Sequence, residues 1–263
     1  MIWQRIASAA VAAPVLLVAV WVGGPVFSVL VAALAVWAAL EFYSLVGKAG
    51  HRPVTALGVL FVLLFVGNAY VDQTYTAPLL TSLILIVLAW LLWRRQFAGV
   101  VTDWAVTLAG VLYAGWLLSL FVSLRDLPQG LGWTVLAALA TFASDTGAFA
   151  VGSLWGRRRL VPHISPGKTL EGSVGGLVSA VVVTMILGLV FSLPVNVLGM
   201  VGLGLAVGTL AQIGDLAESM LKRSLNVKDA SRLIPGHGGI LDRVDSLGFA
   251  VVVVFFWAKW VVG

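Results

Sequence analysis

Three aspartates in the last fifth of the chain have the chemistry and spacing of a metal site. Asp215 lies within an apolar segment, and Asp242 and Asp245 stand three residues apart after a glycine-rich turn. Such hard oxygen ligands favour Mg²⁺ over a transition metal, and a lone His237 among glycines makes a poor zinc site. The chain has no cysteine, which excludes thiolate ligands. We therefore expect a Mg²⁺ site built on these acids.

Asp215 belongs to a polar helix face. Asp215, Glu218, Ser219 and Lys222 recur at i, i+3, i+4 and i+7, a spacing that stacks them on one side of a helix. An acid among apolar spans is expensive unless it faces a polar cavity or a cation. The spacing thus predicts a polar site at the cytoplasmic end of this helix.

Basic and glycine residues accompany these acids. Lys and Arg neutralise phosphate charge, and glycines let backbone N–H groups approach an anion closely. The candidates in this segment are Lys222, Arg223, Lys228, Asp229, His237, Gly238, Gly239 and Arg243. A cation, fixed positive side chains and a glycine-rich turn together predict a polyphosphate site. The alternative is a purely structural role, in which these residues form salt bridges within a loop.

A second polar segment, residues 152–172, has the same character. Its candidate binding residues are Ser165, Lys168, Thr169 and Glu171, with Asp145 just before it and three consecutive arginines, 157–159, inside it. The alternative is an electrostatic anchor on anionic lipid, although such an anchor would not need the Ser165-Pro166-Gly167 turn residues. Gly167-Lys168-Thr169 resembles the end of a P-loop, but Pro162 stands where that motif requires glycine, which excludes a Walker A site.

The composition places both segments beside a membrane. The chain has 263 residues, of which 60% are hydrophobic and 10% charged, against roughly 25% charged in an average soluble domain. This excludes a soluble globule and a disordered chain. Seven stretches carry no charge at all, namely residues 6–40, 53–71, 73–93, 104–124, 127–144, 172–214 and 246–258.

Nine membrane helices account for these stretches, because a span needs roughly 20 apolar residues and turns at 23–25 and 192–194 divide the two longest. Nine spans place 14 of the 16 Lys and Arg on the side of the N-terminus. The positive-inside rule makes that side cytoplasmic and puts the C-terminus outside. The pairs Gly172/Gly176 and Gly204/Gly208 predict close helix packing. We expect an all-α, polytopic integral membrane protein whose active site faces the cytoplasm.

The two halves of the chain differ in polar content. In residues 1–130, with about five spans, Glu41, Asp72 and Asp103 fall at predicted span ends, where a solvated carboxylate is the default. Residues 131–263, with about four spans, hold the two cytoplasmic loops, 152–172 and 222–245. We expect the first half to be a scaffold for dimerisation and the second to be catalytic.

The polar segments resemble a known family. Residues 219–245, from Ser219-Met-Leu-Lys222-Arg223 through Pro235-Gly-His237-Gly238-Gly239 to Asp242-Arg243-Val-Asp245, are similar to the signature of the CDP-diacylglycerol synthases, also called phosphatidate cytidylyltransferases. Asp145-Thr-Gly147-Ala148, the run 165–172 and Gly214-Asp215 match further marks of the family. Phe149 and Gly167 depart from it, where Tyr and a second Lys are common.

The resemblance implies a reaction and a set of roles. CTP and phosphatidate would give CDP-diacylglycerol and pyrophosphate, in a homodimer of the bacterial inner membrane that has no nucleic-acid partner. Asp215 and Asp242 would bind Mg²⁺ with Ser219 and Asp245 beside them, and a second, monovalent cation such as K⁺ is left open. The catalytic set would be Asp215, Asp242, Asp245, Lys222, Arg223, His237 and Arg243, and the substrate-binding set Asp145, Ser165, Lys168, Thr169, Glu171, Lys228, Asp229, Gly238 and Gly239.

Two other functions compete with this reading. A CTP-dependent polyprenol or phytol kinase has a similar topology but would transfer the γ-phosphate to an alcohol, and would need a base. An ion-coupled transporter is the alternative of another class, because intramembrane Asp145 and Asp215 could mark an ion path. Transporters place such groups near the midplane, whereas these acids lie toward one side.

Overall fold

The computed structural model describes residues 14–95, 97–225, 227 and 239–262. Nearly all of these residues are helical, and their only strands form one short hairpin. The chain divides into two compact units, described separately below: Met1–Ser123 with Asp229–Asp242, and Leu124–Lys228 with Arg243–Gly263. Residues 239–242 therefore group with the first unit, although most of α10 (Leu241–Val262), which begins within them, lies in the second.

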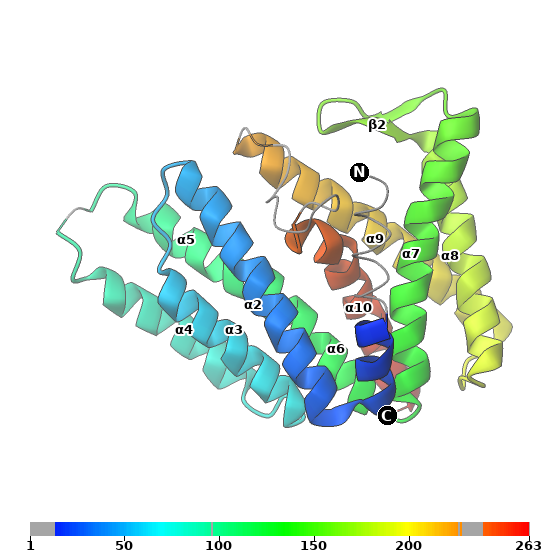
Figure 1. Cartoon of the computed structure of the whole chain (residues 1–263), viewed down its shortest axis with the longest axis horizontal. Helices are drawn as coiled ribbons and strands as arrows, with labels where there is room; N and C mark the ends of the chain where they lie inside the picture. The colour runs from blue at the N-terminus through cyan, green and yellow to red at the C-terminus, as the bar shows by residue number, and fades with distance from the viewer. Residues whose placement is uncertain (1–13, 96, 226, 228–238, 263) are drawn as a thin grey trace. The chain divides into compact units, whose positions relative to one another are not determined.

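The first unit is a bundle of apolar helices (Figure 1). Residues 14–22 are helical, and Pro25 stands in the first turn of α2, where its missing N–H costs no hydrogen bond. The other elements are α2 (Gly24–Lys48), α3 (Thr55–Tyr70), α4 (Thr76–Leu91), α5 (Val100–Gly110), the π-helical segment η1 (Val111–Trp116) and α6 (Leu117–Asp126), which continues into the second unit.

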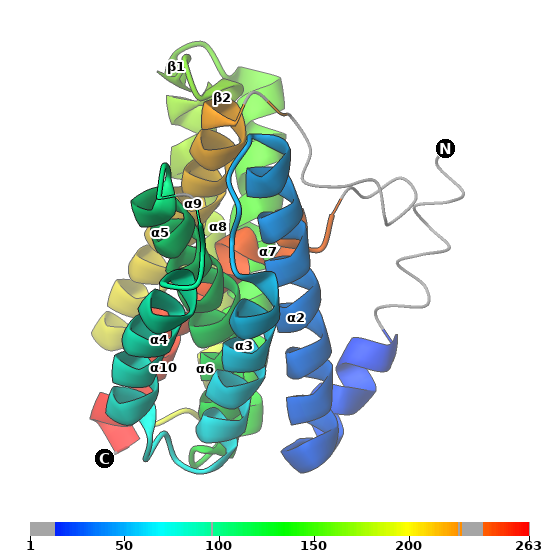
Figure 2. The ribbon, with the colours of Figure 1, turned by 90° about the vertical axis from the view of Figure 1, so that its left-hand side faces the viewer.

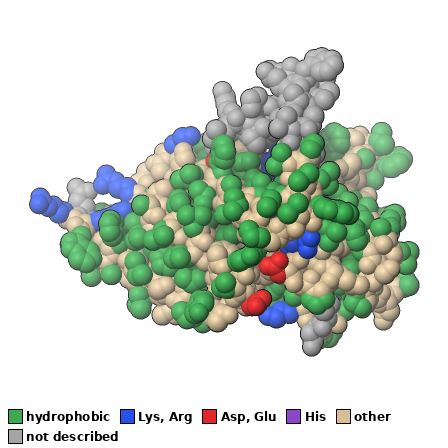
Figure 3. Space-filling view, turned by 60° about the horizontal axis from the view of Figure 1, so that its bottom comes forward, with side chains coloured by type: hydrophobic (Ala, Val, Ile, Leu, Met, Phe, Trp, Pro, Cys, Tyr) green, Lys and Arg blue, Asp and Glu red, His purple; other side chains and the backbone are tan. Residues whose placement is uncertain are grey.

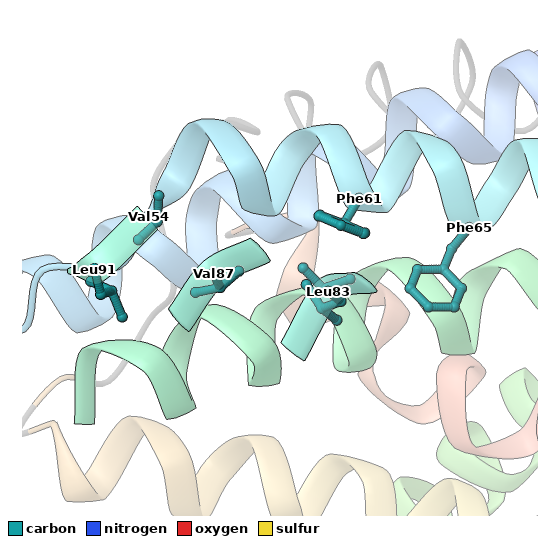
Figure 4. Close-up of a cluster of buried hydrophobic side chains, with 7 residues drawn as sticks. Val54, Phe61, Phe65, Leu83, Val87 and Leu91 are labelled. Atoms are coloured by element: carbon teal, nitrogen blue, oxygen red, sulfur yellow. The ribbon is translucent and has the colours of Figure 1, made fainter. Parts of the chain in front are cut away.

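Helices α3 and α4 lie side by side (Figure 2) and share a buried core (Figure 4). Phe61 and Phe65 of α3 pack with Leu83 and Val87 of α4, and each of the four is at most 2% exposed. Helix α2 contacts α5 through Tyr43, whose hydroxyl donates to the Thr107 carbonyl oxygen at 2.8 Å. A methyl group at Gly58 of α3 or Gly110 of α5 would overlap the Tyr43 ring, so these glycines let α2 approach both helices.

Asp103 is buried in this unit and not solvated. Its carboxylate accepts the Arg52 backbone N–H at 2.6 Å and forms an ion pair with Arg94. The expectation of a solvated carboxylate was wrong here, because the Arg52 backbone N–H and the Arg94 side chain take the place of water at this carboxylate. Glu41 is also buried, at 3% exposed, whereas Asp72 lies on the surface as expected.

The second unit is built on close packing of α7 against α8 and of α8 against α9. Its elements are α7 (Gly130–Trp155), β1 (Arg159–Val161), β2 (Ser165–Thr169), α8 (Leu170–Val190), α9 (Val197–Ser224) and α10 (Leu241–Val262). The antiparallel hairpin β1–β2 follows the end of α7 (Figure 1), with Arg159 opposite Thr169. The first polar connection is thus shorter than 152–172, because both helices extend into that range.

Small residues line the contacts between these helices, as the glycine pairs predicted. A Cβ at Gly172 would lie 2.7 Å from the Ala148 carbonyl oxygen of α7, and one at Gly204 would lie 2.6 Å from the Val181 Cα of α8. Backbones that touch in this way bring the polar ends of α7, α8 and α9 together. Figure 2 shows α7, α8 and α9 running alongside one another beneath the hairpin.

The helices have the length and surface of membrane spans. Within the described part of the chain, six helices are long and apolar enough to cross a bilayer, and α3 and α4 are shorter apolar helices. The face drawn in Figure 3 is mainly hydrophobic or uncharged, with few charged side chains. Trp93 and Trp260 are 81% and 80% exposed, an unusual exposure in water but common at a lipid interface. The chain is an all-α multi-pass membrane protein.

Gly204→Ala tests the packing of α8 on α9. The added methyl group meets backbone and not a movable side chain, so we expect a loss of about 1–3 kcal/mol in unfolding free energy. Gly202→Ala on the same helix is the matched control, because its nearest neighbour, a Trp257 ring atom, lies at 3.5 Å. Thermal unfolding in detergent, followed by tryptophan fluorescence, measures both. Equal midpoints for the two variants would contradict this packing.

Candidate functional site

The polar face predicted on α9 is present and its members contact one another. The Ser219 hydroxyl donates to Asp215 Oδ1 at 3.4 Å, and Lys222 Nζ lies 2.5 Å from Glu218 Oε2. Glu218 is 2% exposed and Asp215 is half-buried. One turn of α9 therefore carries two carboxylates, each matched by a polar or positive neighbour on the same helix.

The hairpin contributes a positive group to Asp215. Lys168 of β2 places its Nζ 2.7 Å from Asp215 Oδ2, and this ammonium group is shielded from solvent. Arg223 Nε donates to the Ile164 carbonyl oxygen at 3.4 Å, which ties the turn of the hairpin to the end of α9. The structure thus brings together a proposed metal ligand and a proposed phosphate ligand from two separate sequence motifs.

Asp145 and Asp245 join Asp215 in the second unit. Asp145 of α7 lies within electrostatic range of Asp215, Lys168 and Arg243, and Asp245 of α10 lies within range of Asp215, Asp145 and Lys222. Like charges so close together repel unless cations separate them. Three carboxylates thus lie within electrostatic range of three positive side chains.

Close contact between α9 and α10 positions Asp245. A Cβ at Gly214 would lie 2.6 Å from the Asp245 carbonyl oxygen, so a larger residue would push the helices apart. Asp245 is 7% exposed, and its Oδ1 accepts the Ser246 backbone N–H at 2.7 Å. Since α10 begins at Leu241, Asp242 and Asp245 share a helix face as predicted.

A hydrogen-bonded pair fixes α8 against α9 one turn before Asp215. The Ser173 hydroxyl donates to Gln212 Oε1, and Gln212 Nε2 donates back to the Ser173 carbonyl oxygen at 3.0 Å. Gly176 makes room for this amide, since a Cβ there would lie 2.9 Å from Gln212 Nε2. The sequence did not single out Gln212, because a glutamine in an apolar run has no motif.

Several predicted binding residues have local structural contacts. The Thr169 hydroxyl accepts the Gly172 N–H at 3.1 Å and so caps the start of α8. Glu171 Oε2 accepts the backbone N–H groups of Arg157 and Arg158 at 3.0 and 3.2 Å, which fixes the exit from α7. Ser165 begins β2.

A pocket of about 430 Å³ lies beside this exit, lined by Leu154, Trp155, Gly156, Arg157 and Glu171. None of the clustered aspartates lines it. The four remaining candidates, Lys228, Asp229, His237 and Gly238, lie outside the described residues.

The start of α10 belongs to the first unit, where two carboxylates accept backbone N–H groups near it. Asp242 Oδ2 accepts the Gly239 N–H at 2.8 Å, and Glu41 Oε2 of α2 accepts the Leu241 N–H at 2.8 Å. Sequence reasoning missed Glu41, because its partner is a backbone group 200 residues away that leaves no mark in the sequence.

The described residues contain no group of three His, Cys, Asp or Glu side chains placed to hold a metal ion. A magnesium ion needs fewer protein ligands than that, because it keeps several waters and is bound by one or two carboxylates together with substrate phosphates. Asp215 fits this role chemically, since both of its oxygens already point at a hydroxyl or an ammonium group.

Known proteins match the chain along its whole length. Residues 3–261 match the cytidylyltransferase family. A phosphatidate cytidylyltransferase of Synechocystis is 31% identical over 97% of this chain and 95% of that protein, and one of Staphylococcus aureus is 35% identical over 75% of each. A phosphatidate cytidylyltransferase of Bacillus subtilis is 42% identical over 57% of this chain and 56% of that protein. The chain belongs to the cytidylyltransferase family, that of the CDP-diacylglycerol synthases which its motifs indicated.

Proposed function

We propose that this protein transfers the cytidylyl group of CTP to phosphatidate, giving CDP-diacylglycerol and pyrophosphate. The family and the names of its relatives support the reaction class. The observation that carries the proposal is the Lys168–Asp215 pair, because it joins an acid suited to a metal with a base suited to phosphate. The signature of residues 219–245 argues against the kinase, and the placement of the acids toward one side argues against the transporter.

The reaction needs positioning and charge neutralisation more than acid–base chemistry. The second pKa of a phosphate monoester is about 6, so the phosphatidate phosphate is already largely ionised near neutral pH. One of its oxygens attacks the α-phosphorus of CTP, and the bond to the pyrophosphate oxygen breaks. Both reactants are anions, so Lys168, Lys222 and Arg223 would lower their mutual repulsion and hold them in line.

Magnesium is part of the proposal. Asp215 and Asp242 would hold the ion, with Ser219 and Asp245 beside them, and a monovalent cation such as K⁺ could accompany it. When bound, the ion would neutralise charge on the α-phosphate and on the leaving pyrophosphate. In the structure the Lys168 ammonium stands in for a cation at Asp215 Oδ2.

The proposed orientation follows from the distribution of charge. The proposed topology has nine spans, with the N-terminus in the cytoplasm and the C-terminus outside. It places 14 of the 16 basic residues on the cytoplasmic face of the inner membrane. CTP is a cytoplasmic metabolite, which suits an active site on that face. A homodimer with residues 1–130 as scaffold is the proposed assembly.

Asp215→Asn and Asp242→Asn test the reaction and the metal together. We expect each to abolish transfer of label from [α-³²P]CTP to phosphatidate by purified protein in detergent, because the amide cannot replace a charged ligand. Asp72→Asn is the control, since Asp72 is exposed and its φ of 55° suits asparagine. Wild-type turnover in either site variant would refute the metal assignment. Lipid labelled from [γ-³²P]CTP would instead establish the kinase.

Lys168→Met should strengthen Mg²⁺ binding and yet lower turnover. Without the ammonium group Asp215 loses its competing cation, so half-saturation by Mg²⁺ should come at a severalfold lower concentration. Turnover should still fall about tenfold or more, because a phosphate contact is lost. Lys48→Met, at the exposed end of α2, is the control. A Mg²⁺ requirement that rises in Lys168→Met would show that the lysine does not compete at Asp215.

A further inference from the structure

Glu41 is a buried carboxylate in a helix far from the signature in sequence. It lies on α2 with 3% exposure, among Ala38, Phe42 and Leu45, which are also buried. A charged group in such a place is unfavourable unless hydrogen bonds compensate it. Glu41 Oε2 obtains one such bond from the Leu241 backbone N–H at 2.8 Å.

Leu241 is the first residue of α10, so this hydrogen bond fixes a helix start. The first N–H groups of a helix have no partner within it, and the helix dipole favours negative charge there. The Glu41 carboxylate supplies the acceptor, a role that an amide oxygen at the same place could also fill. Next to it, Asp242 Oδ2 accepts the Gly239 N–H at 2.8 Å, so two carboxylates hold the turn of residues 239–242.

Gly239 independently shows how tightly this turn rests on Glu41. A methyl group at Gly239 would overlap the Glu41 carboxylate, with the carboxyl carbon only 2.9 Å away. The backbone of Gly239 is not in the left-handed region, so the demand for glycine is steric and not conformational. The carboxylate that a methyl group would meet is the one that accepts the Leu241 N–H, so any shift of Glu41 to admit the methyl group acts on that hydrogen bond.

We propose that Glu41 is a positioning residue for Asp242. It acts through Leu241 to set the start of α10, and thereby the place of Asp242 in the first turn of that helix. Glu41 touches neither substrate nor metal. The inference rests on the proposed function, because that function gives Asp242 its catalytic role.

The proposal predicts a graded response at position 41. Glu41→Ala removes the acceptor and should lower turnover about 10–100-fold, with a raised Mg²⁺ requirement, as is usual when a group that orients a metal ligand is lost. Glu41→Gln keeps an oxygen that can accept the Leu241 N–H and should recover most of that loss. Asp72→Asn, which removes an exposed carboxylate of the same unit, should behave as wild type.

The steady-state assay of folded, purified protein decides between positioning and two other roles. A group that only stabilises the fold would leave turnover per folded molecule and the Mg²⁺ requirement unchanged in Glu41→Ala. A group that acts by its charge would make Glu41→Gln as inactive as Glu41→Ala. Either result would overturn the proposal.

Gly239→Ala provides a second route should Glu41→Ala fail to assemble. We expect a loss of turnover similar to that of Glu41→Ala, since both break the contact with Leu241. The double variant should be no worse than Glu41→Ala alone, because the two changes act on one contact. Wild-type turnover in Gly239→Ala, or losses that multiply in the double variant, would count against the pairing.

Hydrogen exchange reads the same contact without any turnover. In intact protein in detergent, the peptide that contains the Leu241 amide should exchange about tenfold faster in Glu41→Ala than in wild type or Asp72→Asn. Equal exchange would overturn the proposal. Accelerated exchange in a protein that proves to have no cytidylyl transfer would place the failure in the proposed function and not in the contact.

Discussion

The need to compensate carboxylates among apolar helices organises this molecule. A charge that leaves water must gain hydrogen bonds or an opposite charge of comparable value. Three acids meet that need differently: Asp103 through an arginine and a loop amide, Glu218 through a lysine on its own helix, and Asp215 through a lysine from the hairpin. The first arrangement is closed and structural, whereas Asp215 remains half-buried and able to exchange its partner.

Close approach of helix backbones makes this compensation possible. Glycines at the contacts of α8 with α7 and α9 bring polar groups from three helices within reach of one another, because no side chains separate the backbones. In lipid, apolar side chains gain little by leaving the bilayer, so such packing and interhelical hydrogen bonds hold the bundle. The Ser173–Gln212 pair adds a polar tie where the helices approach the acids.

The sequence was most informative where a periodic pattern or a motif lies within one helix or one continuous segment. Apolar runs separated by turns predicted the helices, and the i, i+3, i+4, i+7 spacing predicted the face of Asp215, because both follow from the geometry of one helix. Asp145 was a poor marker of a helix end, because α7 continues ten residues beyond it. The hairpin was not foreseen, since its strands have only three and five residues.

Contacts between distant segments could not be predicted from the sequence, for a physical reason. The partner of Glu41 is a backbone amide and that of Asp215 is a lysine from another motif, so neither contact follows from local spacing. The number of spans, the orientation, the dimer and the roles of the two halves stay predictions. The family, by contrast, was recognisable because residues 219–245 keep their spacing without interruption.

The contact of Gly239 with Glu41 has a consequence for recombination among related proteins. Residues 239–242 group with the N-terminal helices, so a crossover near residue 124 that exchanges one half separates two positions that fit by size. A chimera whose new half brings a larger residue at 239, or a different side chain at 41, would inherit an ill-fitting pair. Working hybrids should therefore carry both positions from one parent, whatever the origin of the other loops.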